Sequence, residues 1–318
     1  MRKWILILTA ALFFAICMAG CESGSAESSK NENSAGENSG KGSAAPVFDF
    51  ESRTVTLNSG YEMPAAGLGT YALSDEECYN SVTALLEDGG RLIDTASYYG
   101  NEESVGRAIR DSDVPRKEIF VTTKIYPTEF DDPEGAIEAC LERLDIGYID
   151  LMLLHHPGAG EINAYREIEK AIDAGKIRSA GVSCYYIRET DAFLKNVSTP
   201  PALIQNEIHP YYQDTDVVRH IQSLSQKIVV QSWYPLGGRG YTGPVLNNRV
   251  IDEIAGRYGK SPAQVILRWD LQNGVAVIPG SSSPKHIREN ISIFDFELTA
   301  DEMKQIAKLN RNEKHDWY

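Results

Sequence analysis

The sequence is poor in cysteine, and its lysine and arginine residues form no cluster. The five cysteines are widely spaced along 318 residues, so we expect neither a disulfide-stapled fold nor a cysteine-based metal centre. The formal net charge of -14 argues against nucleic acid as a partner. No glycine fingerprint of the dinucleotide-binding kind follows the first predicted strand, and we predict no metal site.

Long hydrophobic runs are also missing, and the apolar run at residues 4–19 is short for a membrane span. It follows Arg2 and Lys3 and ends in CMAGC, which resembles the lipobox of bacterial lipoproteins, where the cysteine is acylated. We therefore predict a signal peptide over residues 1–20 and a lipid anchor on Cys21. An uncleaved amino-terminal anchor is the alternative. Both interpretations tie the chain to the cell membrane, and signal cleavage places the rest of it outside the cytoplasm.

Residues 21–45 carry almost no apolar side chain. The segment begins at Cys21 and is rich in serine, glycine, glutamate and asparagine. Such a chain cannot bury enough apolar surface to offset its loss of conformational entropy on folding. We predict a disordered tether over residues 21–45 and a folded domain over residues 46–318.

Short apolar runs alternate with stretches of helical periodicity along this domain. The clearest helical patterns are residues 75–89 and 132–145. Uninterrupted apolar runs are typical of parallel strands covered by helices on the outside. The strand candidates are residues 65–71, 91–96, 119–124, 148–155, 177–183, 202–208, 227–235 and 275–280.

Eight such units over about 250 residues predict an α/β fold, a (β/α)8 TIM barrel. An open doubly wound sheet is the alternative, and the missing glycine fingerprint argues against it. Residues 54–63 contain the turn residues Asn58, Ser59 and Gly60. They predict an amino-terminal β-hairpin that closes the bottom of the barrel.

Three predicted strands end on an ionisable residue. Asp94, Lys124 and His155 end the second, third and fourth strand candidates, and Tyr99 follows Asp94 on a loop. Because the carboxyl ends of barrel strands meet at one mouth, we expect these four side chains in one pocket. A lysine ammonium should lower the pKa of a neighbouring phenol, and a carboxylate should keep that lysine charged. Tyr99 could then act as a general acid on a carbonyl oxygen that His155 holds.

The segments that carry these residues resemble the aldo-keto reductase family, in order, over residues 54–309. They read RLIDTASYYGNEESVG, IFVTTK, DLMLLHHP, GVS, IQNEIHPYYQ and VIPGSSSPKHIREN. The resemblance implies a barrel that binds an extended nicotinamide cofactor and transfers its hydride to an aldehyde or ketone. It implies a catalytic tetrad of Asp94, Tyr99, Lys124 and His155, with Tyr98 as a bystander, and a monomeric protein.

The resemblance also implies the ligand-binding positions. His155 and Tyr126 are expected to contact the small carbonyl substrate. Cys184 replaces an asparagine that normally shares the cofactor carboxamide. The expected cofactor-binding residues are Gly69, Thr70, Tyr71, Ser183, Gln205, Trp233, Leu236, Ser281, Glu289 and Asn290.

The adenine end of the cofactor site departs from the family pattern. Gly280 and His286 occupy the positions at which a lysine and an arginine of the family bind the ribose phosphate. Lys285 and Arg288 are close enough in sequence to substitute for them. NADP(H) is the favoured cofactor, and NAD(H) is the alternative.

Two other function classes stay open. One is a lyase or aldolase that uses Lys124 as a Schiff-base nucleophile. The other is a membrane-anchored barrel that binds a ligand or cofactor without turnover, which the departures at Cys184, Gly280 and His286 suggest. Free nicotinamide cofactor is expected to be scarce outside the cytoplasm. The cofactor is then held tightly, or comes from an unusual supply, or the role is not turnover, and the sequence does not choose among these.

Overall fold

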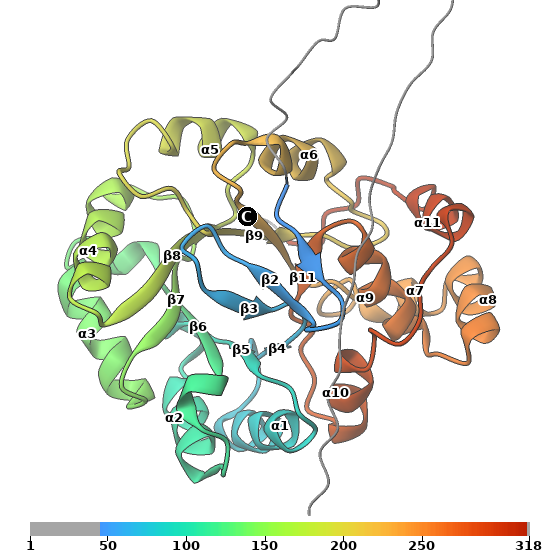
Figure 1. Cartoon of the computed structure of the whole chain (residues 1–318), viewed down its shortest axis with the longest axis horizontal. Helices are drawn as coiled ribbons and strands as arrows, with labels where there is room; N and C mark the ends of the chain where they lie inside the picture. Colours follow the sequence, from blue (N-terminus) through green and yellow to red (C-terminus); the bar gives the residue numbers. More distant parts are fainter. Residues whose placement is uncertain (1–44, 317–318) are drawn as a thin grey trace, which may run out of the picture. The chain divides into compact units, whose positions relative to one another are not determined.

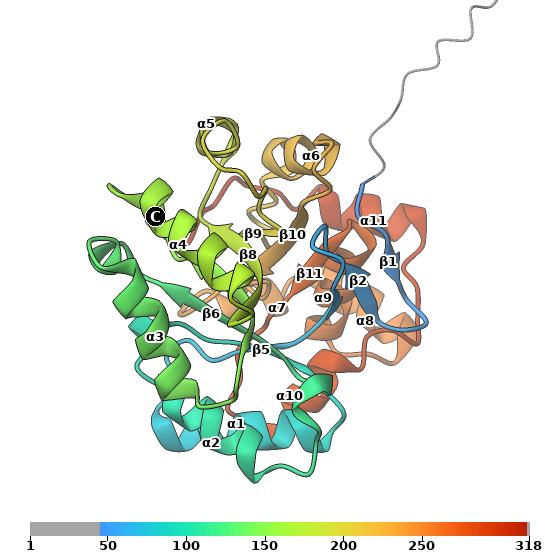
Figure 2. The same ribbon diagram turned by 60° about the vertical axis from the view of Figure 1, so that its left-hand side comes forward.

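An eight-stranded parallel sheet lies at the centre of the domain, and helices surround it (Figure 1, Figure 2). The structure is a computed structural model that describes residues 45–316. The predicted signal peptide, Cys21 and the tether up to residue 44 lie outside these residues. Within residues 45–316, none of the helices has the length and apolar character needed to cross a membrane.

Strands and helices alternate along the chain. The strands are β1 (Phe48–Asp49), β2 (Thr54–Thr56), β3 (Glu62–Pro64), β4 (Leu68–Gly69), β5 (Leu92–Asp94), β6 (Phe120–Ile125), β7 (Ile149–Leu154), β8 (Ile177–Ser183), β9 (Leu203–Glu207), β10 (Val229–Trp233) and β11 (Val275–Val277). The helices are α1 (Asp75–Glu87), α2 (Glu102–Asp111), α3 (Pro133–Leu144), α4 (Glu161–Asp173), α5 (Ile187–Phe193), α6 (Thr215–Ser223), α7 (Thr242–Leu246), α8 (Arg249–Tyr258), α9 (Pro262–Gln272), α10 (Pro284–Ile291) and α11 (Ala300–Ala307). Short 3₁₀ helices cover Ser97–Tyr99, Arg116–Glu118 and Pro127–Glu129.

The parallel sheet runs from β4 to β11 in chain order and curls until its first and last strands meet. Parallel bridges join Ala66 to Val277 and Gly69 to Gly280. At this seam a Cβ atom on Gly69 would come within 2.7 Å of the carbonyl oxygen of Ile278, so a glycine is required there. The predicted α/β fold with eight parallel strands is confirmed. The first strand is shorter than the predicted residues 65–71, because only two of its residues form the regular ladder.

The predicted helices begin and end on side chains that favour helix termini. Ser74 and Glu77 form a capping box at the start of α1. Asp132 caps α3, and Asp145 ends it in the left-handed conformation at a φ of 47°. Both helical patterns, residues 75–89 and 132–145, are therefore confirmed to within two residues at each end.

The predicted hairpin packs against the amino-terminal ends of the parallel strands and lies across the ring of strands in Figure 1. β2 and β3 pair antiparallel, and β1 adds a third strand. The Asn58 side chain donates to the carbonyl oxygens of Pro201 and Gln226, which precede β9 and β10, at 2.9 Å. Val55 and Met63 join a buried apolar cluster inside the ring that includes Leu92, Phe120, Leu151, Leu153, Leu203, Val229 and Ala276.

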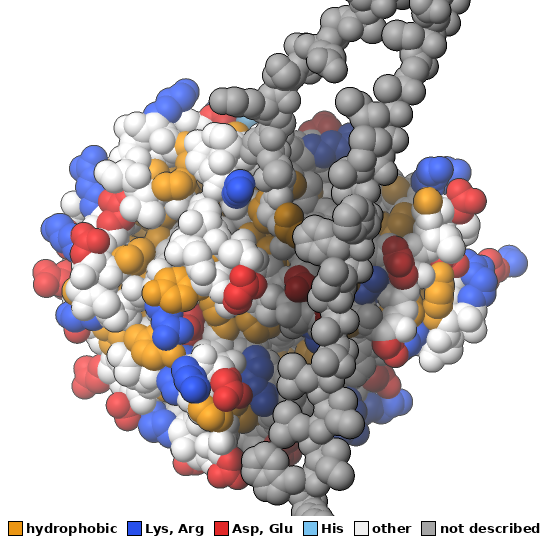
Figure 3. All heavy atoms as spheres, viewed as in Figure 1, with side chains coloured by type: hydrophobic (Ala, Val, Ile, Leu, Met, Phe, Trp, Pro, Cys, Tyr) orange, Lys and Arg blue, Asp and Glu red, His pale blue; other side chains and the backbone are white. Residues whose placement is uncertain are grey.

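The interior of the barrel becomes polar toward the carboxyl ends of the strands. The buried polar side chains there include Asp94, Lys124, Gln205 and Gln231. On the outer face shown in Figure 3, acidic and basic side chains of the described residues are interspersed. Those buried polar side chains, in contrast, are concentrated at one end of the interior.

Candidate active site

The structure brings the four predicted tetrad residues together. Asp94 is the last residue of β5, Lys124 lies near the end of β6, and His155 directly follows β7. Tyr99 is the last residue of the 3₁₀ helix that follows β5, which turns its hydroxyl group back toward Lys124. The shared carboxyl end of the parallel strands positions all four.

Lys124 uses each of its three ammonium hydrogens. It donates to Asp94 Oδ1 at 2.5 Å, to the carbonyl oxygen of Thr95 at 2.9 Å, and to the hydroxyl oxygen of Tyr99 at 3.2 Å. An ammonium group has no further donor and no acceptor. Because the Tyr99 oxygen accepts from Lys124, the hydroxyl hydrogen of Tyr99 is left to donate elsewhere.

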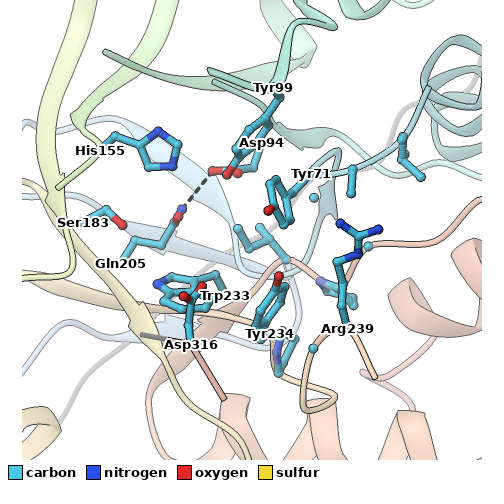
Figure 4. A pocket seen from close by; sticks show the side chains of 18 of the residues that line it. Tyr71, Asp94, Tyr99, His155, Ser183, Gln205, Trp233, Tyr234, Arg239 and Asp316 are labelled. Carbon is cyan, nitrogen blue, oxygen red and sulfur yellow. Dashed lines mark hydrogen bonds between the residues drawn. The ribbon is translucent and has the colours of Figure 1, made fainter. Parts of the chain in front are cut away.

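Asp94 is bound at both carboxylate oxygens. Its second oxygen, Oδ2, accepts a hydrogen bond from Gln205 Nε2 at 2.8 Å, drawn as the dashed line in Figure 4. Gln205 Nε2 also donates to Gln231 Oε1 at 2.7 Å. A polar chain therefore crosses the interior from Tyr99 on the β5 side to Gln231 on β10.

The pKa of Tyr99 differs from the sequence-based expectation. Burial, followed by the negative charge of Asp94, raises the pKa of the Tyr99 phenol well above its ordinary value. The prediction that Lys124 lowers this pKa is wrong, because Asp94 neutralises the ammonium and water is excluded. Burial also raises the pKa of Asp94 and lowers that of Lys124, and the pairing of their charges opposes both shifts. Tyr99 is consequently fully protonated at neutral pH.

His155 is a neutral imidazole beside Tyr99. Burial, then the charges of Lys124 and His156, lower its pKa well below the ordinary value. Its ring meets the Tyr99 ring edge-on, with centroids 5.4 Å apart. Among the described residues, His155 Nδ1 has no hydrogen-bond partner.

A cavity of about 520 Å³ opens over these groups. Asp94, Tyr99 and His155 line it, whereas Lys124 lies beneath the surface. The other predicted ligand-binding residues that line it are Gly69, Tyr71, Tyr126, Ser183, Gln205, Trp233, Leu236 and Ser281. In Figure 4 the aromatic rings of Tyr71, Trp233 and Tyr234 lie around the cavity, together with polar side chains that include Asp94, His155, Ser183 and Gln205.

Three predicted cofactor residues do not line the cavity. Thr70 is buried, and its hydroxyl group donates to the carbonyl oxygen of Asp94 at 3.0 Å, so it supports the site from below. Glu289 and Asn290 lie on α10, outside the lining residues. Lys285 and Arg288, the predicted replacements for the phosphate-binding cations, lie on the same helix and both form ion pairs. Lys285 pairs with Glu289 at 3.7 Å, and Arg288 pairs with Asp88 at 2.8 Å.

Several lining residues escaped the sequence analysis. Tyr98, predicted to be a bystander, lines the cavity and stacks on Tyr126 with centroids 4.5 Å apart. Arg239 and Tyr234 reach the rim from the segment after β10 (Figure 4). The signal for Arg239 is its setting between Gly238 and Gly240, both at positive φ, which is typical of a ligand-binding loop.

The carboxyl-terminal segment forms another part of the wall, through Asp316. Glu207 accepts hydrogen bonds from the backbone N–H groups of His315 and Asp316 at 2.6 and 3.0 Å. Glu207, His209 and His315 place ligand-type atoms within 4.8 Å of one another. However, His209 Nδ1 accepts from the N–H of Tyr211 at 3.3 Å, so its Nε2 donates to Glu207. Glu207 and His209 Nε2 are therefore engaged in hydrogen bonds, and His315 Nδ1 donates to the carbonyl oxygen of Gly237 at 2.6 Å.

Comparisons with known proteins agree with this geometry. The profile of the Aldo/keto reductase family matches residues 65–311. This chain belongs to the aldo/keto reductase family.

Relatives of this aldo-keto reductase include a glyoxal reductase from Bacillus subtilis, 40% identical over 265 residues that cover 82% of this chain and 94% of that protein. The methylglyoxal reductase DkgA of Escherichia coli is 38% identical over 266 residues, which cover 82% and 94%. The crystal structure of an aldo-keto reductase from a Medee basin deep-sea metagenome library has a TM-score of 0.79 at 36% identity, over 82% of this chain and 96% of that one. An aldo/keto reductase from Brucella melitensis has a TM-score of 0.75 at 36% identity, over 80% and 98%.

The protein is therefore an oxidoreductase, and aldo-keto reductases use NAD(P)H. The cavity of this aldo-keto reductase fits such a group. Trp233 offers a half-buried indole for stacking against a flat ring, and Ser183 and Gln205 offer polar groups for a carboxamide. Arg239, which has no ion pair among residues 45–316, could hold a phosphate.

Proposed function

We propose that this chain reduces an aldehyde or ketone to an alcohol, with Tyr99 as the general acid. The observation that carries the proposal is the hydrogen bond from Lys124 to the Tyr99 oxygen, which leaves the phenolic hydrogen to donate into the cavity. When bound, the reduced nicotinamide supplies the hydride. Tyr99 supplies the proton, so that a carbonyl carbon gains hydride and its oxygen gains H⁺.

His155 orients the substrate in this proposal. A neutral imidazole donates one hydrogen bond to a carbonyl oxygen without competing with Tyr99 as an acid. Burial keeps His155 neutral, since it lowers its pKa well below the ordinary value. Tyr126, whose ring lies 5.5 Å from that of His155, contributes to the substrate wall.

The structure gives little support to a Schiff-base mechanism. An attacking lysine needs a deprotonated amine with access to the substrate. Lys124 is fully buried, does not line the cavity, and donates to three acceptors. We therefore place Lys124 as a support for Tyr99.

Glyoxal and methylglyoxal are the first substrates to test, because relatives carry those names. We propose NADP(H) as the cofactor, with Arg239 at the rim as the cation available for a phosphate. Titration of residues 46–318 with NADPH and with NADH, followed by tryptophan fluorescence, measures the preference. Tight NADPH binding without turnover of any carbonyl would favour the binding-only alternative.

Tyr99→Phe is the central test of the proposal. It should bind NADPH as the wild type does and lose turnover on the order of 10²–10⁴-fold. Tyr98→Phe is the matched control, since it removes a neighbouring hydroxyl and keeps the ring that stacks on Tyr126. Retention of turnover in Tyr99→Phe would refute the assignment.

We also propose that Cys21 carries the lipid anchor, on the lipobox resemblance alone. Mass spectrometry of the full chain from a bacterial membrane fraction would detect the acylated amino-terminal cysteine. A Cys21→Ala chain that stays in that fraction would contradict this anchor and favour an uncleaved amino-terminal one.

A further inference from the structure

Gln231 lies next to Gln205 but takes no part in the proposed chemistry. The two are register partners on neighbouring strands, β10 and β9, so both side chains point to the interior at the same level. Both are buried, and they are joined by the 2.7 Å hydrogen bond from Gln205 Nε2 to Gln231 Oε1. Gln231 does not line the cavity.

Donors and acceptors alternate along the chain that ends at Gln231. Lys124 only donates, and the Asp94 carboxylate only accepts. The group that faces Asp94 Oδ2 must therefore be the amide nitrogen of Gln205. That nitrogen has two hydrogens, and the second needs an acceptor, which Gln231 Oε1 supplies.

The amide of Gln231 is oriented by this requirement. Its own Nε2 is buried without a hydrogen-bond partner among the described residues. Turning the amide over would place two NH₂ groups against each other and leave Gln205 with an unsatisfied hydrogen. The observed orientation therefore favours Gln205 at the expense of Gln231.

We propose that Gln231 is a positioning residue, which locks the Gln205 amide so that Asp94 stays bound at both oxygens and Lys124 stays aligned on Tyr99. With both Gln205 hydrogens engaged, only its carbonyl oxygen is left for a ligand, so the cavity selects a hydrogen-bond donor at this point. The inference rests on the proposed reductase function for its kinetic consequences, but the lock itself does not depend on turnover.

The first measurement tests whether both amide hydrogens of Gln205 are hydrogen-bonded in the wild-type protein. Nuclear magnetic resonance of glutamine side-chain amides, with Gln205 assigned by a Gln205→Asn variant, reports hydrogen exchange at Nε2. Both hydrogens of Gln205 should exchange slowly, and in Gln231→Leu one of them should exchange much faster. Fast exchange of either hydrogen in the wild type would overturn the proposal, whether or not Gln231→Leu folds.

The second measurement is kinetic. Gln231→Leu should lower kcat on the order of ten-fold. The acidic limb of its kcat–pH profile should move to higher pH, because a carboxylate that loses a donor is easier to protonate. Gln231→Glu retains the acceptor and should recover most of kcat above neutral pH.

Gln264→Leu is the control for loss of a buried glutamine. Gln264 lies in the capping box of α9 and donates to Ser292, away from the cavity. The Gln264→Leu variant should have a lower melting temperature and an unchanged kcat–pH profile.

An unchanged kcat–pH profile in Gln231→Leu, or equal losses of kcat in Gln231→Leu and Gln231→Glu, would overturn the proposal. An inactive wild type would instead refute the reductase function, and the exchange data would still decide the role of Gln231.

Discussion

Lys124 donates a hydrogen bond to the hydroxyl oxygen of Tyr99 from a position that solvent does not reach. The ammonium charge is held there by Asp94, with which it forms a buried ion pair. Each partner of such a pair depends on the other, because a lone charge in this interior is strongly disfavoured. The arrangement therefore links the proposed role of Tyr99 to the stability of the fold.

Lys124→Met should abolish turnover and reduce the free energy of unfolding by about 3–5 kcal/mol, since it leaves Asp94 unpaired. Urea unfolding and NADPH oxidation measure the two effects. The double variant Lys124→Met, Asp94→Asn removes both charges and should regain most of the stability, but no activity. A double variant less stable than Lys124→Met would show that the two losses are independent.

Stability should fall as the pH drops below about 6.5, because of His155 and of His156, whose pKa burial lowers to about 4. Burial lowers the pKa of His155 well below its ordinary value, so the unfolded chain takes up a proton that the folded protein does not. At pH 5.5 this costs about 1.4 kcal/mol relative to pH 7.5. His155→Gln should show a smaller difference in the free energy of unfolding between these two pH values. An equal difference in His155→Gln and in the wild type would contradict the assignment to His155.

Cys184→Asn should raise stability and tighten cofactor binding. Cys184 lies in the cavity wall at a φ of 63°, a conformation that asparagine adopts more readily than cysteine or alanine. The asparagine amide would also add a donor and an acceptor for the carboxamide. We expect a melting temperature above that of Cys184→Ala and a lower Kd for NADPH. The opposite ranking would indicate that the asparagine amide cannot be accommodated in this wall.

Arg239→Gln should weaken NADPH binding by about ten- to a hundred-fold, since a charged hydrogen bond to phosphate contributes roughly 1.5–3 kcal/mol. The difference from the wild type should shrink at high salt, where exposed charges are screened. Fluorescence titration at two salt concentrations tests this. Arg249→Gln, which breaks an exposed ion pair with Glu253 on α8, should bind NADPH normally. Equal affinities of Arg239→Gln and the wild type would exclude phosphate binding by Arg239.

The convergence of the residues at the strand ends could be predicted from the sequence, because all strands of a parallel barrel end at the same mouth. Asp94, Lys124 and His155 each terminate an apolar run, and parallel strands bring such ends together whatever the loops do. The pKa of Tyr99 was not readable in this way. Its direction depends on how completely water is excluded and on the neutralisation of Lys124 by Asp94, which only the packed structure shows.

Some residues on irregular segments were also not predicted to line the cavity. Arg239 reaches the cavity through a run of glycines whose path no periodicity predicts, and Asp316 does so because Glu207 captures its backbone. The cofactor role of Glu289 stays a prediction, since it lies on α10 outside the residues that line the cavity.

The attachment of residues 315–316 to Glu207 uses main-chain N–H groups, which every residue except proline possesses. The His315 side chain adds a further attachment, because it is buried, donates from Nδ1 to the carbonyl oxygen of Gly237 at 2.6 Å and stacks on Tyr241. Asp316 lines the cavity, so a substitution at Asp316 changes the cavity wall while the attachments of His315 stay intact. Asp316 is in this sense a position at which the shape of the cavity can vary without disturbing Tyr99 and its supports.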